Sequence, residues 1–337
     1  MLGFDLTEEQ RALQETARKF VKDRIIPVAA ECDRESKFPK DVFKAAWELG
    51  LVAPNIPAEY GGSGCSELEH TIITEELAYG CSGIQTSMTA NALAATPIIL
   101  GGSEAQKKKY LGMLTSQPVY ASYATTEPGA GSDVAALQTR AKKVGDAWEL
   151  TGQKCFITNG SWASFYVIFA TVDPALKHKG IAAFIVDRDA AGVSVGKKED
   201  KMGQRASDTA TIVLEEVKVP AENLLAKEGE GFKLAMQTFD RTRPDIGASA
   251  TGLASAMPPT CSGATPISGA WACTAAGSLV PAISFELGRI AYFLLNQVCC
   301  ICFVHTYPLS GNCASANSLE TLHFLMLPAA AVLWNDP

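Results

Sequence analysis

The chain has 337 residues and a formal net charge of −7 at pH 7. This length is enough for two or three domains with a large buried core, and the acidic balance argues against a general nucleic-acid role. The ten cysteines show no regular spacing before residue 255, so they indicate no disulfide framework.

The first third of the chain predicts a helical domain over residues 1–117. Thr7-Glu8-Glu9-Gln10 has the pattern of a capping box, in which the Thr7 hydroxyl accepts from the amide of Gln10. Apolar residues then recur at helical spacing, and Pro27 is predicted to bend or end this first helix. Further helices are predicted over 40–49, 66–79, 84–100 and 103–115.

From Val119 the apolar residues change to a spacing of two, which is typical of strands. Gly145-Asp146 and Thr151-Gly152 are predicted as turns between strands. A β-barrel-like middle domain over 118–225, following a helical domain, makes the fold class α+β and not a parallel α/β sheet. Strands are predicted over 139–144, 148–150, 166–171, 182–186 and 211–214.

A second, truncated helical domain is predicted to begin over 226–256, where apolar residues from Phe232 to Phe239 form one stripe. Met257-Pro258-Pro259 is expected to stop this helix.

The composition changes after Ala254. Residues 255–337 contain four of the 65 charged residues of the chain, and a folded domain needs more polar surface than this. We therefore expect 257–337 to be an aberrant, poorly folded tail. Its apolar run Ile290–Val304 is shorter than the roughly 20 residues of a membrane span. Cys299, Cys302 and His305 have ligand-like spacing but lack a matching second pair, so no metal site is predicted.

The stretch Tyr120–Val134 combines a strand with an abrupt break at Glu127-Pro128-Gly129-Ala130-Gly131. Glycines at such a break allow the backbone to approach a ligand closely, and nearby hydroxyls can donate to its acceptors. A tight strand-to-loop turn is the alternative interpretation. The pattern fits neither the GxGxxG nor the GxxxxGK[ST] phosphate-binding motif.

Thr126–Asp133, with the sequence TEPGAGSD, resembles the first signature of the acyl-CoA dehydrogenase family. Three later blocks resemble further signatures of that family, and the flanking sequence is most similar to its medium-chain enzymes. The resemblance extends from about Phe4 to about Leu253. The three blocks are GQKCFITNG at 152–160, MGQRASDT at 202–209 and FDRTRP at 239–244.

The resemblance implies FAD as the cofactor and an acyl-CoA as the substrate. Phe156 stands where the family's motif GxKxWITN has tryptophan, so the aromatic ring is kept and the indole N–H is lost. Without the resemblance, Phe156 fits equally a core aromatic, and Asp240 with Arg243 fits a surface ion pair. The implied FAD contacts are Tyr123, Thr125, Thr126, Gly131, Ser132, Phe156, Ile157 and Thr158. The implied substrate contacts are Ser132, Asp240 and Arg243.

The reaction implied by the resemblance is the α,β-dehydrogenation of a medium-chain fatty acyl-CoA to a trans-2-enoyl-CoA, a step of fatty acid β-oxidation. The family reduces an electron-transferring flavoprotein, forms homotetramers and works in the mitochondrial matrix. This chain carries no signal peptide or Arg-rich leader before its first helix. We expect no targeting sequence and no membrane span here.

In the medium-chain enzymes of the family the catalytic base lies in a YEGTSQ-like segment, and no such segment occurs in this sequence. Some relatives carry the base at the position of Thr242, and threonine does not replace it; Asp245 is one turn away and is a weak candidate. The RKTFGK-like segment that reaches the FAD of a neighbouring subunit is also missing, together with most of the tetramer interface.

The catalytic residue therefore stays unassigned, and we expect weak FAD binding and impaired activity. A non-catalytic flavin- or acyl-CoA-binding remnant, or an unstable product of a faulty gene model, is the alternative.

Overall fold

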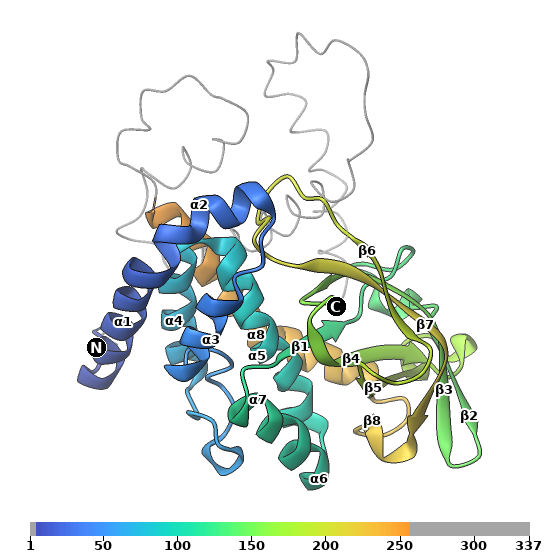
Figure 1. The fold of residues 1–337 in the computed structure, drawn as a ribbon. Coiled ribbons are helices and arrows are strands. Elements are labelled where there is room, and N and C mark those ends of the chain that lie inside the picture. The colour runs from blue at the N-terminus through green and yellow to red at the C-terminus, as the bar shows by residue number, and fades with distance from the viewer. Residues whose placement is uncertain (1–4, 257–337) are drawn as a thin grey trace, which may run out of the picture. The chain divides into compact units, whose positions relative to one another are not determined.

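The computed structural model describes residues 5–256 (Figure 1). The predictions made for 257–337, a poorly folded tail with no metal site and no membrane span, lie outside the described residues.

The N-terminal part is helical, as predicted, and its capping box is present: Thr7 accepts from the Gln10 amide, and the Gln10 side chain accepts from the Thr7 amide. Gly50 ends α3 with a positive φ of 71°. The helices are α1 (Glu8–Phe20), α2 (Ile26–Glu35), α3 (Lys40–Glu48), α4 (Glu67–Gly80), α5 (Ser82–Gly101), α6 (Glu104–Gln106) and α7 (Gly112–Ser116). Short π-helical segments occur at Val21–Ile25 and Lys107–Leu111.

Pro27 does not end the first helix. Helical conformation continues from α1 through the π-helical segment Val21–Ile25 into α2, where Pro27 lies in the first turn. A proline at that position is tolerated because the amide it lacks has no helical partner there. The extra residue of the π segment absorbs the change in the hydrogen-bond ladder.

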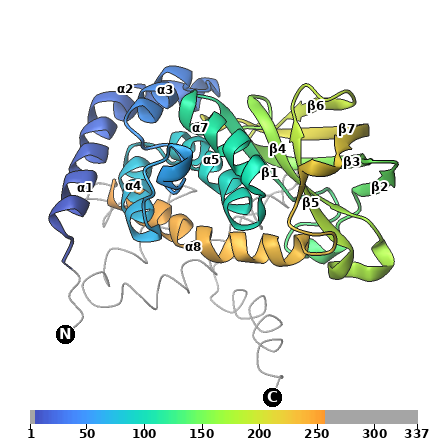
Figure 2. The ribbon, with the colours of Figure 1, turned by 90° about the horizontal axis from the view of Figure 1, so that it is seen from below.

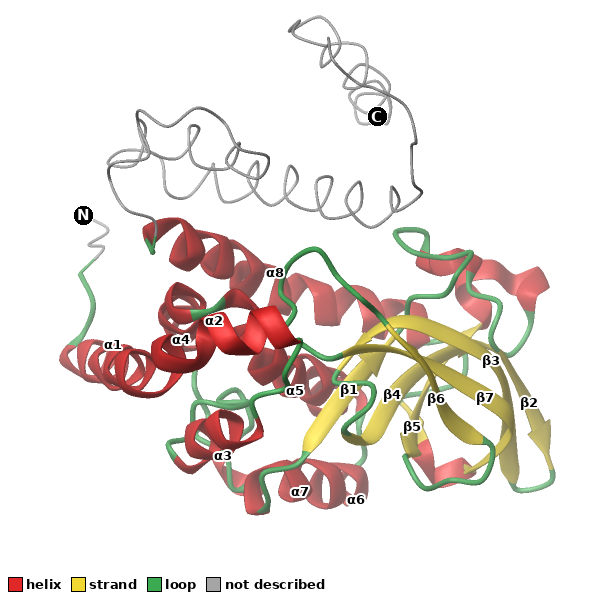
Figure 3. Cartoon of the chain, turned by 45° about the horizontal axis from the view of Figure 1, so that its top comes forward, coloured by secondary structure: helices red, strands yellow, loops and turns green. Residues whose placement is uncertain are grey.

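The middle part is an eight-stranded sheet within the described residues (Figure 3). Its strand order is β6-β7-β3-β2-β4-β5-β8, and β1 pairs with β4. Most pairs are antiparallel, while β4 pairs in parallel with β1 and, at one residue pair, with β2. The α+β class is confirmed. The strands are β1 (Tyr120–Ala124), β2 (Arg140–Val144), β3 (Ala147–Thr158), β4 (Ala163–Thr171), β5 (Ile181–Asp187), β6 (Val193–Lys198), β7 (Thr209–Pro220) and β8 (Leu224–Leu225).

The predicted turn at Thr151-Gly152 is wrong, because both residues lie inside the long strand β3. The pairing register between β3 and β7 shifts between Leu150 and Gly152, which is a β-bulge. Gly152 has a φ of +157°, and a Cβ there would lie 2.6 Å from Oγ1 of Thr139. The glycine therefore marks a close approach within a strand. The other predicted turn, Gly145-Asp146, does join β2 to β3.

Two asparagines join the helices to the sheet. Asn91 of α5 donates to the Val119 carbonyl at 2.8 Å and accepts from the Ala121 amide at 2.9 Å, so it continues the hydrogen bonding of β1. Asn159, after β3, donates to the Ser87 carbonyl of α5 at 2.8 Å. Both contacts fix the start of β1 and the end of β3 against the same helix.

The last described helix, α8 (Gly231–Ser255), packs on α4, α5 and β5 (Figure 2). It starts against the sheet, where Gly231 lies directly on the backbone of Ala182, and it contains Pro244. A helix was predicted within 226–256, and α8 confirms it. Because α8 touches both the sheet and α4, it connects the two parts of the fold.

Candidate functional site

The end of β1 and the end of β3 lie side by side. Ser122 donates to the Thr158 carbonyl at 2.7 Å, and the Cys155 amide donates to the Thr126 carbonyl at 3.0 Å. The second bond joins a bulge in β3, between Lys154 and Ile157, to the break after β1. The structure therefore brings together the two sequence blocks that carry most of the predicted cofactor contacts.

A buried ion pair supports the break after β1. Nζ of Lys154 lies 2.7 Å from Oε1 of Glu127, and their side chains are 0% and 5% exposed. The same Nζ donates to the Thr125 carbonyl at 3.1 Å, while Glu127 accepts from the amides of Gln138 and Thr139 at 2.6 and 3.0 Å. These bonds hold the backbone of Thr125–Glu127 in one position.

The two partners respond differently to burial. Burial lowers the pKa of Lys154 to about 8, although Glu127 opposes the shift. Burial alone would raise the pKa of Glu127, but Lys154 and the hydrogen bonds outweigh it and hold that pKa below its ordinary value.

Two buried hydroxyls at the end of β1 lack a hydrogen-bond partner elsewhere in residues 5–256. Apart from each other, the buried hydroxyls of Tyr123 and Thr125 have no hydrogen-bond partner among the described residues. A Cβ added at Gly131 would meet no atom within 4 Å, so there is room beside that backbone. Buried polar groups normally find a partner, and a ligand rich in polar atoms such as FAD fits this cradle.

At the bulge in β3, Phe156 is exposed whereas the neighbouring Ile157 is buried. Ile157 is 2% exposed and packs in the core of the sheet, so only its backbone is available to a cofactor. Phe156 has a positive φ of 57° and is 41% exposed. A bulky residue in this backbone region is an outlier of the kind found at functional sites. Phe156 is thus not the core aromatic of the alternative interpretation.

The predicted substrate residues on α8 lie close to the end of β1. The ring centroids of Phe239 and Tyr123 are 5.7 Å apart, which places this turn of α8 beside the end of β1. Asp240 and Arg243 form an ion pair at 2.7 Å, with side chains 67% and 44% exposed. Both residues are accessible to a ligand. Ser132 is also exposed, on the loop after the break.

Asp245, the weak candidate for a base, lies on another side of α8. Its side chain is 7% exposed, and its Oδ2 lies 3.1 Å from Nδ1 of His70 in α4. Thr242 donates to the Thr238 carbonyl of its own helix at 3.0 Å. Neither residue is therefore presented to the end of β1 as a free base.

Sequence reasoning missed two supports of the site. The first is the Lys154–Glu127 pair, for which a lysine inside an apolar strand was the available signal. The second is Asn159, which is buried at a φ of +58° and donates across to α5. Asparagine tolerates this backbone region better than most residues, so its position directly after a strand was a usable signal.

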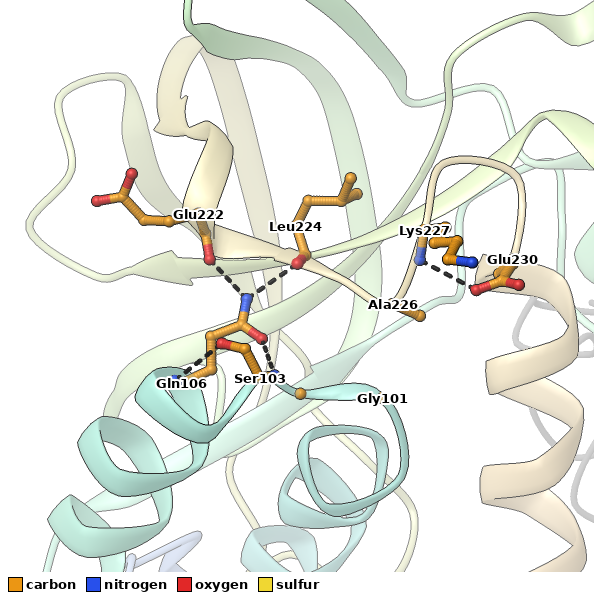
Figure 4. A pocket seen from close by; sticks show the side chains of 9 residues that line it. Gly101, Ser103, Gln106, Glu222, Leu224, Ala226, Lys227 and Glu230 are labelled. Carbon is orange, nitrogen blue, oxygen red and sulfur yellow. Dashed lines mark hydrogen bonds between the residues drawn. The ribbon is translucent and has the colours of Figure 1, made fainter.

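A separate hollow of about 530 Å³ lies between the end of α5 and the start of α8 (Figure 4). The Gln106 amide there donates to the carbonyls of Glu222 and Leu224 at 2.6 and 2.9 Å, and the Lys227 amide donates to Glu230. The two Gln106 bonds tie Glu222 and β8 to α6, while the Lys227–Glu230 bond closes the turn that precedes α8. None of the predicted site residues lines this hollow.

No helix within residues 5–256 is long and apolar enough to cross a membrane. In the same range, no group of three or more His, Cys, Asp or Glu side chains is placed to hold a metal ion.

The acyl-CoA dehydrogenase N-terminal domain family matches residues 7–118, and the acyl-CoA dehydrogenase middle domain family matches residues 122–217. This chain belongs to the acyl-CoA dehydrogenase family. It is similar to a probable medium-chain specific acyl-CoA dehydrogenase of Caenorhabditis briggsae, with 48% identity over 75% of this chain and 62% of the relative.

Solved structures agree with this assignment. Butyryl-CoA dehydrogenase from Megasphaera elsdenii has 38% identity and a TM-score of 0.73, covering 76% of this chain and 68% of that one. An acyl-CoA dehydrogenase from Bacillus anthracis, complexed with FAD, has 33% identity and a TM-score of 0.69 over 75% of this chain and 43% of that one. The chain spans about three fifths of the length of the curated relatives that it matches.

Proposed function

We propose that this chain binds FAD and acyl-CoA for the α,β-dehydrogenation of a medium-chain fatty acyl-CoA to a trans-2-enoyl-CoA. The observation that carries the proposal is the pairing of the break after β1 with the bulge in β3, which presents unpartnered hydroxyls beside an exposed aromatic ring. The family membership supports the same chemistry.

The residues of this chain would hold the cofactor in two ways. Tyr123, Thr125 and Thr126 supply hydroxyls from the β1 side, and Gly131 and Ser132 supply an open backbone and a further hydroxyl. Phe156 supplies a ring face from the β3 side, with Thr158 and the backbone of Ile157 beside it. FAD, when bound there, supplies the hydride acceptor that protein side chains lack.

The substrate would be held on the α8 side. Asp240 and Arg243 are accessible polar groups on the turn that follows Phe239, and Ser132 lies on the loop after the break. An acyl-CoA carries phosphates and amides that such groups recognise. The α proton of a thioester is weakly acidic, so turnover also needs a base held within hydrogen-bond reach.

No base is assigned among residues 5–256. The Thr242 hydroxyl donates to its own helix, and Asp245 is paired with His70. We therefore infer that this chain, loaded with FAD, reacts far more slowly than a relative that carries the base. A non-catalytic flavin- and acyl-CoA-binding protein is the second candidate, and the same two observations favour it.

We also propose an electron-transferring flavoprotein as the acceptor and the mitochondrial matrix as the location of this chain. The relatives named as mitochondrial support the location.

Anaerobic mixing of the FAD-loaded chain with octanoyl-CoA tests the function. Bleaching of the flavin absorbance at a low but measurable rate supports an impaired dehydrogenase. Binding of octanoyl-CoA without bleaching favours the non-catalytic candidate. Absence of both binding and bleaching, with FAD bound, contradicts both.

A further inference from the structure

A buried histidine–aspartate pair joins α4 to α8. Nδ1 of His70 lies 3.1 Å from Oδ2 of Asp245, and the two side chains are 2% and 7% exposed. The Thr71 hydroxyl, which donates to the Glu67 carbonyl at 2.7 Å, lies 3.4 Å from the other carboxylate oxygen, Oδ1. Both oxygens of Asp245 therefore contact consecutive residues of α4.

The ring of His70 is held mainly from one side. Its Nε2 is buried and has no hydrogen-bond partner in the described part of the chain. The tautomer with hydrogen on Nδ1 fits this setting, because it donates to Asp245 and leaves no buried N–H without an acceptor. The contact with Asp245 therefore sets the orientation of the ring, and the ring in turn sets the position of Asp245.

The pair lies directly after a weak point of α8. Pro244 has no amide hydrogen, so the carbonyl of Asp240 loses its ordinary helical donor four residues later. The turn that carries Asp240 and Arg243 thus has less support from the helix itself. Asp245, the next residue, is fixed from outside by α4.

The residue that contacts α4 and the exposed ion pair lie on different faces of α8. At roughly 100° per residue, Asp240 and Arg243 lie about 60° apart on one side, while Asp245 lies about 160° from Arg243. One face of this turn is therefore anchored to α4, and the other face presents the exposed ion pair.

A second close contact lies two turns further along α8. A Cβ added at Gly252 would collide with the carbonyl oxygen of Glu75 in α4, so the two backbones approach closely there. The Asp245–His70 pair and this glycine contact together fix α8 on α4 at two points.

We propose that His70 and Asp245 are positioning residues that hold the Asp240–Arg243 turn of α8 in place for the CoA part of the substrate. This inference rests on the proposed function for the identity of the ligand. The anchoring of the turn itself rests on the contacts between α4 and α8.

The test uses the full chain and free coenzyme A, which binds without turnover. Calorimetry measures the affinity for coenzyme A, and amide hydrogen exchange measures the protection of residues 240–250. Asp245→Ala removes the anchor, and Asp245→Asn keeps an oxygen that accepts from Nδ1 of His70. Leu234→Val, in the buried face of the same helix, is the control for general loss of packing.

Asp245→Ala is expected to weaken coenzyme A binding about tenfold and to speed exchange over 240–250, because a displaced binding group loses its contacts. Asp245→Asn restores the affinity to within about twofold of the parent chain, since it keeps the hydrogen bond. Leu234→Val lowers the melting temperature and leaves the affinity unchanged.

Unchanged affinity and unchanged exchange in Asp245→Ala would overturn the inference, and so would an equal loss of affinity in Leu234→Val. If the parent chain does not bind coenzyme A, the proposed acyl-CoA substrate is contradicted. Amide hydrogen exchange then tests the contact between α4 and α8 without a ligand: faster exchange confined to 240–250 in Asp245→Ala supports the anchoring of the turn, and unchanged exchange contradicts it.

Discussion

Lys154 and Glu127 form an ion pair that is almost completely buried, with 2.7 Å between Nζ and Oε1. Lys154 comes from the middle of β3 and Glu127 from the break after β1. Their contact therefore fixes the distance between the two segments that we propose as the cofactor site.

Replacing Lys154 by methionine leaves the Glu127 carboxylate buried without its partner. We expect the free energy of unfolding to fall by about 3–5 kcal/mol, as for other broken buried pairs. Chemical denaturation followed by circular dichroism measures this. Lys142→Met, on the exposed side of β2, is the matched control and is expected to change stability by at most about 0.5 kcal/mol. Equal stability of both variants would contradict the role of the pair.

The pH dependence of stability follows from Glu127. The pKa of this carboxyl in the folded protein lies below its ordinary value of 4.5. Its contribution is therefore fully present above pH 4.5 and is lost as the pH falls through the folded pKa. Denaturation of Glu127→Gln is expected to approach that of the parent chain as the pH falls below 4.5 and to differ most near neutrality. A stability difference independent of pH would contradict this assignment.

Gly152 is predicted to be intolerant of a side chain. A Cβ there would lie 2.6 Å from Oγ1 of Thr139 and 2.8 Å from its Cα, at a backbone φ of +157°. We expect Gly152→Ala to destabilise the chain by about 1–3 kcal/mol through overpacking. Gly203→Ala, where an added Cβ meets nothing within 4 Å, is the control. A melting temperature for Gly152→Ala equal to that of the control would show that the bulge relaxes freely.

Phe156 is predicted to act on cofactor binding and not on folding. It is 41% exposed at a positive φ, and asparagine adopts this backbone region readily. Phe156→Asn should therefore fold, and it should bind FAD more weakly by about 0.5–1.5 kcal/mol, the usual contribution of an aromatic contact. Phe156→Trp should keep or improve FAD binding. An unchanged dissociation constant in Phe156→Asn would remove Phe156 from the site.

Much of the fold could be predicted from patterns among neighbouring residues. The capping box at Thr7 and the change of spacing at Val119 depend on neighbouring residues, so they are visible in the sequence. The turn at Thr151-Gly152 was wrong because a glycine in a bulge and a glycine in a turn look alike locally. Only the approach of Thr139 distinguishes them.

The candidate site was predicted only where it depends on neighbouring residues. Its loop, TEPGAGSD, is a continuous motif, but its supports are contacts between distant segments. Asn159 meets Ser87 of α5, and His70 meets Asp245 of α8, across separations of 72 and 175 residues. No spacing rule connects such pairs, so they appear only when the chain is folded.

A titration of FAD into the apo chain, followed by quenching of flavin fluorescence, tests the central claim that the β1 break and the β3 bulge form a flavin site. The matched variant is Gly131→Ala, whose Cβ would meet no protein atom within 4 Å and would occupy the space left for the ligand. We predict saturable binding by the parent chain, weaker binding by Gly131→Ala, and equal melting temperatures for the two without FAD. A folded parent chain that shows no saturable binding, or a Gly131→Ala variant that binds FAD as tightly as the parent, would contradict the account.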